Sequence, residues 1–180
     1  MQKILETHRN ESTVVNKLQG FACRRDRSIE RFLKTKAIPF EKADKCRTYL
    51  YIEGGFMGAE DPKILAYLTV AISNMKFKPY VSKTMKKRLN GIFQNDEAPC
   101  YLIGQLGKND NYSDKVEGRE LIDFAMGIIG IGYNAVGGRF VRVDSRNNTK
   151  LMKFYEKNGF RLVQTDDESD LIQFVRFFEN

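Results

Sequence analysis

The chain has 180 residues and a mass of 20.8 kDa, enough for one well-cored domain and short of two comfortable ones. Hydrophobic residues make up 42% and charged residues 29%, values that are typical of a soluble globular protein and argue against disorder. No apolar run approaches the roughly 20 residues that a membrane span requires, and the start turns polar too soon for a signal peptide. We therefore expect a cytoplasmic protein, with no membrane partner, that folds as a single domain over residues 1–180.

The net charge of +7 is unevenly distributed along the chain. Residues 1–100 hold 19 Lys and Arg against 11 Asp and Glu, whereas residues 101–180 hold 11 against 12. The excess lies in two basic clusters, residues 24–47 and residues 76–90. Such clusters either attract a nucleic acid or another anionic ligand, or form a solvated surface that keeps the protein soluble. Composition leaves both interpretations open.

The first part of the chain predicts one helix and one strand. Residues 1–20 are weakly patterned and begin with a mobile end, with room for a first helix or strand. Apolar residues recur at helical spacing after Ser28, a suitable N-cap, and Pro39 ends this predicted helix. Residues 48–52 are β-branched and aromatic and precede Gly54-Gly55, a pattern typical of a strand and a turn.

A buried strand and a basic segment follow. After a turn at residues 60–62, residues 64–72 are continuously apolar, which predicts a strand buried on both faces. Residues 74–97 are basic and polar, with a short helix around 82–93, and we expect them to form an insertion or a flap.

The second half alternates strands and helices. The pattern predicts a central strand at 100–106, a polar loop at 108–115, a helix from about Gly118 to 129 and a strand at 139–143. A helix follows that is capped at Asn147 or Asn148 and ended by Asn158-Gly159. Two closing strands are predicted at 160–164 and 171–177. This order, one crossover among hairpin-like strands, predicts a mixed α/β fold.

The inventory of reactive side chains excludes most simple enzyme classes. The chain has one histidine, His8, so a Ser–His–Asp triad or a histidine metal site would depend on that residue alone. Cys23, Cys46 and Cys100 are odd in number and widely spaced, which excludes a disulfide framework and a CxxC metal site. Cys100 opens a buried strand and is expected to be a core residue. The remaining reactions depend on binding and orientation, and no metal is expected.

The most informative element is the strand, loop and helix at residues 101–129. A loop that delivers backbone N–H groups to a helix N-terminus can bind an anion such as a phosphate. Here that loop is Ser113-Asp-Lys-Val-Glu-Gly118. Every α/β crossover has such a loop and many bind nothing, so the loop alone does not decide the function.

Two segments resemble the GNAT superfamily of acetyl-CoA-dependent N-acetyltransferases. Residues 102–108 read Leu-Ile-Gly-Gln-Leu-Gly-Lys and, with the 113–118 loop, are similar to that family's fourth strand and pyrophosphate loop. Residues 148–160 read Asn-Thr-Lys-Leu-Met-Lys-Phe-Tyr-Glu-Lys-Asn-Gly-Phe, close to the family's Asn-x-x-Ala-x-x-Phe-Tyr-x-x-x-Gly-Phe signature. The earlier elements are similar, more loosely, to the branch of toxin-type acetyltransferases that act on aminoacyl-tRNA.

The resemblance implies an α/β (α+β) GNAT fold. That fold is a mixed, mostly antiparallel sheet of about seven strands flanked by helices and splayed between strands 4 and 5. The splayed strand pairs with the pantetheine arm of acetyl-CoA, and the loop takes the pyrophosphate. The cofactor-binding residues so implied are Gln105, Leu106, Gly107, Lys108, Ser113, Asp114, Lys115, Val116, Glu117, Gly118, Arg119 and Asn148. Tyr155 takes the position of the family's general acid, which protonates the departing CoA thiolate; without the resemblance it would be read as a core tyrosine.

Three positions depart from the family pattern. Val116 stands where the loop's first glycine is expected, and a β-branched residue resists the positive φ that glycine allows. Ser113 replaces the usual Gln or Arg, and Gln105 replaces an Arg. Backbone donors remain and Lys115 adds positive charge, so acetyl-CoA binding is still expected. The departures favour weaker binding, or an inactive site.

The acceptor is inferred from a missing base. The strand at 101–108 has no Asp, Glu or His, and a lysine ammonium with a pKa near 10.4 is hard to deprotonate unaided. An α-amino group, with a pKa of about 7.7–8.0, is already partly neutral. This favours an aminoacyl ester or a peptide N-terminus as acceptor, with a small amine kept as another candidate. Aminoacyl-tRNA is preferred because the family resemblance implies it and the basic clusters suit its backbone.

Two other classes remain. A catalytically silent GNAT-like fold that binds nucleic acid or protein is supported by Val116 and by the basic first half. A non-GNAT nucleotide binder would need a glycine-rich loop, which is absent. The resemblance also implies a homodimer and an antitoxin-like partner, and the apolar tail at 174–178 is suited to extending a partner's sheet.

Overall fold

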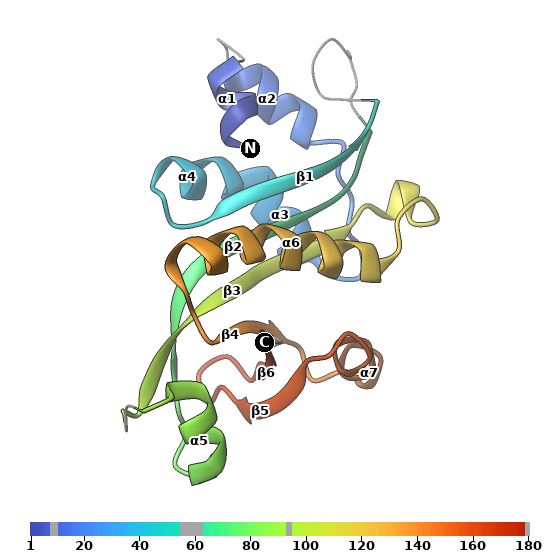
Figure 1. Ribbon diagram of the computed structural model, residues 1–180. Helices are drawn as coiled ribbons and strands as arrows, with labels where there is room; N and C mark the ends of the chain where they lie inside the picture. Colours follow the sequence, from blue (N-terminus) through green and yellow to red (C-terminus); the bar gives the residue numbers. More distant parts are fainter. Residues whose placement is uncertain (8–10, 55–62, 93–94, 179–180) are drawn as a thin grey trace. The chain divides into compact units, whose positions relative to one another are not determined.

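The computed structural model describes residues 1–7, 11–54, 63–92 and 95–178. The elements, labelled in Figure 1, are α1 (Gln2–Thr7), α2 (Glu11–Leu18), α3 (Arg27–Thr35), α4 (Ala37–Lys42), β1 (Arg47–Glu53), β2 (Lys63–Lys76), α5 (Lys83–Asn90), β3 (Glu97–Lys108), the 3-10 helix η1 (Asp110–Tyr112), α6 (Gly118–Val136), β4 (Phe140–Ser145), α7 (Thr149–Lys157), β5 (Arg161–Thr165) and β6 (Ile172–Phe177). His8 and the expected turns at Gly54-Gly55 and 60–62 lie wholly or partly outside the described residues.

The described strands form a six-stranded sheet in the order β1-β2-β3-β4-β6-β5. The β1–β2, β4–β6 and β5–β6 pairs are antiparallel, and the β3–β4 pair is parallel. The mixed α/β class is confirmed, whereas the expectation of about seven strands is one strand too high. Within residues 1–20, where a first helix or strand was expected, the described residues form the two helices α1 and α2.

The chain forms two compact units, which are described separately. Unit 1 comprises Met1–Ala71 and Gln105–Ala125, and unit 2 comprises Ile72–Gly104 and Met126–Asn180. The strands β2 and β3 and the helix α6 each contribute residues to both units. The expectation of a single domain stays a prediction.

In unit 1 the helices α1–α4 pack on β1 and β2 through one hydrophobic cluster (Figure 1). Its fully buried members include Val14, Leu18, Phe21, Leu33, Ala37 and Tyr67. The strand predicted at residues 64–72 is present, and Ile64–Thr69 are all buried, but burial on both faces does not extend to its end, since Ile72 is 69% exposed. Tyr67 donates a hydrogen bond to the Ile29 carbonyl oxygen at 2.6 Å, so this buried phenol has a partner.

The predicted boundaries of α3 were wrong at both ends. Asp26, not Ser28, caps the helix, because its carboxylate accepts the Ser28 backbone N–H at 3.0 Å. The helix ends at Thr35, and a second helix, α4, begins at Ala37. Pro39 lies in the first turn of α4, where the missing N–H has no intrahelical partner to lose, so it begins a helix rather than ending one.

In unit 2 a second cluster joins the ends of β2 and β3 to β4, β6 and α5. It is built from Met75, Phe77, Leu89, Ala98, Cys100, Phe140 and Val175. Residues 74–76, expected to open an insertion, continue β2, and the predicted helix is α5, which Ser82 caps through the Met85 N–H at 3.2 Å. Phe77 and Leu89 anchor the basic segment in this core.

The helix α7 has the ends that the sequence predicted. Asn148 is its N-cap, and its amide oxygen accepts the backbone N–H groups of Lys150 at 2.9 Å and Leu151 at 3.3 Å. Gly159 has a φ of +81°, the left-handed conformation that glycine adopts after a helix. Leu151, expected on the buried side with Phe154 and Tyr155, is 39% exposed. None of the helices described here is long and apolar enough to cross a membrane.

Candidate functional site

The end of β3 in unit 1 is anchored by Asn109, which is 1% exposed. Its Oδ1 accepts the backbone N–H groups of Ala22 at 3.2 Å and Asn111 at 3.1 Å, and its Nδ2 donates to the Ile64 carbonyl oxygen at 2.8 Å. Its own N–H donates to the Leu65 carbonyl oxygen at 2.8 Å. One side chain therefore joins three separate segments at the point where the candidate phosphate loop begins.

The loop itself exposes polar side chains around one buried residue. Ser113, Asp114, Lys115, Glu117 and Arg119 are all exposed, and Gly118 is half-buried. Val116, at 2% exposed, is the exception and packs in a cluster with Leu65, Ala66, Leu121, Leu106 and Tyr112.

The backbone of Val116 avoids the glycine conformation. Among the described residues, the non-glycine positions with positive φ are Asp44 and Asp170, so Val116 has a negative φ. The loop is therefore fixed by an apolar anchor, where the family pattern has a flexible glycine. Its phosphate-binding potential depends on the N–H groups at the start of α6.

Charges at the start of α6 are already partly paired. The Lys115 ammonium lies 2.5 Å from a Glu53 carboxylate oxygen, and this hydrogen bond raises the pKa of Lys115. The Glu120 carboxylate accepts the Glu117 N–H at 2.9 Å, as the third helical residue does in a capping box. A phosphate here would meet the negative charge of Glu120, and Lys115 would have to leave Glu53 to pair with it.

The end of β3 contains one orphaned acceptor. Gln105 is half-buried, and its Oε1 is buried without a hydrogen-bond partner. Gly107 is buried against α3: a Cβ there would lie 2.3 Å from Ile29 Cγ2. Leu106 packs in the Val116 cluster, and Lys108 is half-buried at the strand end. Unit 1 thus brings the candidate strand and loop residues together through the contact between Leu106 and the Val116 cluster.

In unit 2 the register of β3 with β4 covers three residues on each strand. Tyr101, Leu102 and Ile103 pair with Val141, Arg142 and Val143, and β3 continues from there to Lys108.

Tyr155, the candidate general acid, belongs to unit 2 and is 7% exposed. Its ring lies 5.1 Å from that of Phe154, 5.8 Å from that of Phe160 and 5.7 Å from that of Phe174. Burial, reinforced by the negative charge of Asp144, raises the pKa of Tyr155 to about 12. The phenol is therefore protonated at neutral pH and can donate a hydrogen bond.

Arg142 and Asp144 were not predicted, because residues 139–143 were interpreted only as a strand. Arg142 Nε lies 3.1 Å from Asp144 Oδ1, and Arg142 also donates to the Asn74 carbonyl oxygen at 2.9 Å. Burial raises the pKa of Asp144, although Arg142 opposes this. The sequence did offer a signal for them, because charged residues at alternate positions of an otherwise apolar central strand are unusual.

Other reactive groups do not form a site. Cys100 is 3% exposed, and burial raises the pKa of its thiol to about 11, as expected for a core residue. The part of the chain that the structure describes holds no group of three or more His, Cys, Asp or Glu suited to a metal ion.

Similarity to known proteins was found at the level of structure. No family model and no curated protein matches the chain. A tyrosine-to-phenylalanine mutant of KacT superposes with a TM-score of 0.67 and 24% identity, covering 88% of this chain and 86% of that one. AtaT complexed with acetyl-methionyl-tRNA gives a TM-score of 0.67 and 22% identity, covering 89% of this chain and 86% of that one.

A further AtaT structure is a tyrosine-to-phenylalanine mutant toxin bound to the C-terminus of the antitoxin AtaR and acetyl-CoA. Its TM-score is 0.63 at 19% identity, covering 88% of this chain and 84% of that one. KacT and AtaT are toxin acetyltransferases with the GNAT fold. The chain has the GNAT fold. The superpositions establish that architecture and, at identities of 15–24%, nothing beyond it; the GNAT resemblance of residues 102–160 in sequence agrees with it.

Proposed function

We propose that this protein is an acetyl-CoA-dependent N-acetyltransferase, with aminoacyl-tRNA as the favoured acceptor. The observation that carries the proposal is the buried, protonated Tyr155 on the helix that follows β4, in a fold shared with acetyltransferases. Two of the neighbours described above were studied as tyrosine-to-phenylalanine mutants.

Acetyl-CoA fits the residues present in unit 1. Gln105 Oε1 lacks a partner but is buried, so the side chain would have to turn outward to accept an amide N–H of the pantetheine arm. The backbone of Leu106, Gly107 and Lys108 would pair with the same arm, and an amide there would polarise the thioester carbonyl. The N–H groups at the start of α6, around Gly118 and Arg119, would hold the pyrophosphate, with Ser113 and Lys115 at its edge. Asn148 belongs to unit 2, and its proposed contact with the cofactor rests on the family resemblance alone.

In the reaction the acceptor nitrogen attacks the thioester carbonyl carbon, the carbon–sulfur bond breaks, and the nitrogen loses a proton. Tyr155 would donate its O–H to the departing sulfur. A phenol whose pKa is about 12 is a weaker acid than a thiol with an ordinary pKa near 8.5, so its main contribution is a hydrogen bond to the developing thiolate. The proton lost by the acceptor nitrogen finally protonates the CoA thiolate, so the products are the acetylated amine and the free CoA thiol.

Aminoacyl-tRNA is favoured as acceptor for two reasons. Its α-amino group is partly neutral near pH 7, so it needs no strong base. Lys83 and Lys87 are exposed on α5 and form no ion pair among the described residues, which leaves them available to a phosphate backbone. AtaT was solved with an acetylated methionyl-tRNA. An antitoxin-like partner belongs to the same proposal, since the AtaT toxin binds the antitoxin AtaR. A homodimer is proposed from the family resemblance and the apolar tail at 174–178 alone.

The test combines cofactor binding with transfer. Acetyl-CoA at about 100 times its dissociation constant should stabilise the folded protein by about 2.7 kcal/mol, a rise in Tm of several degrees. Radiolabelled acetyl-CoA with total aminoacyl-tRNA should yield acetylated tRNA, identified by mass spectrometry of the released amino acid. Absence of any thermal shift at millimolar acetyl-CoA would refute the proposal.

One observation favours the alternative of a catalytically silent binding module. Glu120 and the Lys115–Glu53 ion pair occupy the start of α6 in a way that disfavours a phosphate. This alternative would be supported if the protein binds RNA with an affinity that falls as the salt concentration rises, and does not bind acetyl-CoA.

A further inference from the structure

The strand β5 lies at one edge of the sheet, since it comes last in the order of the described strands and pairs with β6. An edge strand leaves a row of backbone N–H and C=O groups to which another strand can pair. At Thr165 these groups face away from β6, because the next residue, Asp166, donates its N–H to the Leu171 carbonyl oxygen and adjacent residues alternate in direction. The edge at Thr165 is therefore open to a partner strand unless another group covers it.

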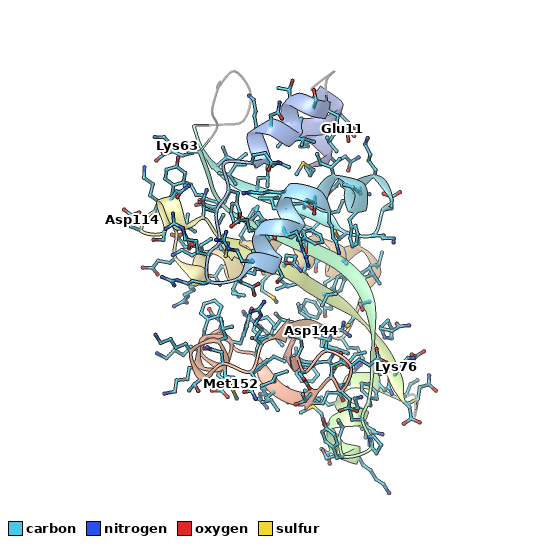
Figure 2. All side chains as sticks on the ribbon, turned by 180° about the vertical axis from the view of Figure 1, so that it is seen from behind. Glu11, Lys63, Lys76, Asp114, Asp144 and Met152 are labelled. Carbon is cyan, nitrogen blue, oxygen red and sulfur yellow. The ribbon has the colours of Figure 1, made fainter. Side chains whose placement is uncertain are left out.

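Residues 77–81, which we call the strap, cover this end of the edge. The strap begins directly after Lys76, the last residue of β2, which Figure 2 labels. The Tyr80 hydroxyl accepts the Thr165 N–H at 3.0 Å and donates to the Thr165 carbonyl oxygen at 3.3 Å. One hydroxyl thus makes both hydrogen bonds that a residue of a neighbouring strand would make. These bonds give Tyr80 a role on the surface, where it is 64% exposed.

Two further contacts hold the strap and its start against β5. Gln164 is 2% exposed; its Oε1 accepts the Lys78 N–H at 2.9 Å, and its Nε2 donates to the Lys76 carbonyl oxygen at 2.7 Å. The Lys78 ammonium lies 2.6 Å from a carboxylate oxygen of Asp167, in the turn after β5. The strap is therefore bonded to the backbone of β5, to a buried side chain of β5 and to the turn that follows this strand.

The sequence of the strap, Phe-Lys-Pro-Tyr-Val, explains its shape. The Val81 N–H donates to the Lys78 carbonyl oxygen at 3.0 Å, which closes a β-turn with Pro79 at its second position, where the fixed φ of proline is favoured. Phe77 and Val81 are buried at the two ends of the strap. Because Pro79 has no backbone N–H, the strap is a poor template for a further strand. It covers the edge of β5 without creating a new one.

Other features protect the rest of β5. Arg161 is exposed, and a charged side chain on an edge strand disfavours pairing with another strand. The register with β6 shifts between Leu162 and Gln164, and such an irregularity disrupts a ladder. The opposite edge strand, β1, is also covered at one point, because Glu41 Oε2 accepts the Thr48 N–H at 2.7 Å. The strap thus covers the part of β5 where neither the charge nor the irregularity acts.

We propose that the strap prevents β5 from pairing with the β5 strand of a second copy of this chain, and that Tyr80 is the residue on which this protection depends. A second copy always presents the same edge, so two uncovered β5 strands would extend the sheet from one molecule to the next. The inference is independent of the proposed function, since it involves neither acetyl-CoA nor an acceptor. It gives part of the basic segment 74–97 a role in controlling self-association.

The experiment compares the full-length protein with Tyr80→Phe, which keeps the ring and removes both hydrogen bonds to Thr165. In the variant the Thr165 amide should exchange its hydrogen about tenfold faster, as expected for the loss of its partner. Sedimentation velocity over a range of protein concentrations should show assemblies larger than those of the wild type. Adding Lys78→Met removes the ion pair with Asp167 as well, so assembly should begin at a lower protein concentration.

The matched control is Tyr133→Phe, which removes the hydroxyl of another unit 2 tyrosine, stacked on Phe178. It should leave the exchange of the Thr165 amide and the sedimentation unchanged. A second variant tests the location of the contact: Thr165→Lys, added to Tyr80→Phe, places a charge at an exposed position of the edge. It should return the sedimentation to that of the wild type.

Three results would overturn the proposal. A Thr165 amide that exchanges at the wild-type rate in Tyr80→Phe would show that the hydroxyl does not protect the edge. Faster exchange without larger assemblies at any concentration would show that the uncovered edge does not pair. Assemblies that persist after Thr165→Lys is added would show that another surface makes the contact.

Discussion

Replacing Tyr155 by phenylalanine separates its catalytic role from its packing. The variant removes one hydroxyl and keeps the ring against Phe154, Phe160 and Phe174, so the free energy of unfolding should change by less than about 1 kcal/mol at neutral pH. If the phenol assists the departing thiolate, kcat should fall by about 10²–10⁴, equivalent to about 3–5 kcal/mol of transition-state stabilisation. The dissociation constant of acetyl-CoA should change by less than about threefold.

The assay is thiol release from acetyl-CoA in the presence of aminoacyl-tRNA, with calorimetry for cofactor affinity. Tyr133→Phe is the matched control, because Tyr133 is a unit 2 tyrosine stacked on Phe178 at 4.1 Å and has no proposed role. A Tyr155→Phe enzyme that retains kcat within about threefold of the wild type would show that Tyr155 is a core residue only.

The same variant has a signature in stability at alkaline pH. The unfolded chain loses the phenolic proton near pH 10, whereas burial raises the pKa of Tyr155 in the folded state to about 12. The unfolded state thus binds fewer protons over this interval, and stability that is fully present below pH 10 decreases by about 3 kcal/mol by pH 12. Chemical denaturation should show that, from pH 10 upward, the free energy of unfolding falls in the wild type but not in Tyr155→Phe. A difference in unfolding free energy between the two proteins that does not change with pH would contradict the burial of the phenol.

Three further predictions address the cofactor segment and the basic surface. Glu120→Gln keeps the hydrogen bond to the loop but removes a negative charge from the N-terminus of α6. The affinity for acetyl-CoA, measured by calorimetry, should rise about two- to fivefold, while the free energy of unfolding falls by about 0.3–1 kcal/mol. An unchanged affinity would show that the phosphates bind elsewhere. Gly107→Ala places a Cβ 2.3 Å from Ile29 Cγ2 and should cost about 1–3 kcal/mol in thermal unfolding, with Ile29→Ala partly restoring it; simple additivity of the two changes would argue against that contact. Lys83→Gln with Lys87→Gln should weaken tRNA binding in filter assays and reduce the slope of log affinity against log salt by about 1.5–2, and an unaltered slope would exclude this surface.

The strand–loop–helix and the α7 motif could be predicted because local rules decide them. The N-cap at Asn148 and the left-handed Gly159 follow from side-chain chemistry and φ preferences within a few residues. The apolar run in β2 likewise predicts burial on both faces for Ile64–Thr69, although not for Ile72 at its end. Pro39 was misread because proline marks the first turn of a helix as well as its end, and the choice depends on how α3 and α4 pack.

The less predictable features depend on contacts between distant residues. Val116 was judged by its φ preference alone, while its actual role is set by Leu65 and Leu121, brought beside it by the fold. Lys115 was expected to offer its positive charge to a phosphate. Its ion pair with Glu53, 62 positions away, partly neutralises that charge and could not be predicted from local sequence. Asp144 and Tyr155 are eleven residues apart on different elements, and their electrostatic coupling emerges only from the register of β4 with β6.

The hydrogen bonds of Asn109 have a consequence for ligand recognition. Because one amide side chain already ties Ala22, Ile64 and Asn111 together in the ligand-free protein, we expect the start of the loop to keep its conformation when a molecule binds. Binding of a ligand to the loop then requires little additional ordering of the backbone, so less of the free energy of the new contacts is lost to conformational entropy. In hydrogen exchange, the amides of Ala22 and Asn111 should be protected in the ligand-free protein and gain little protection on saturation.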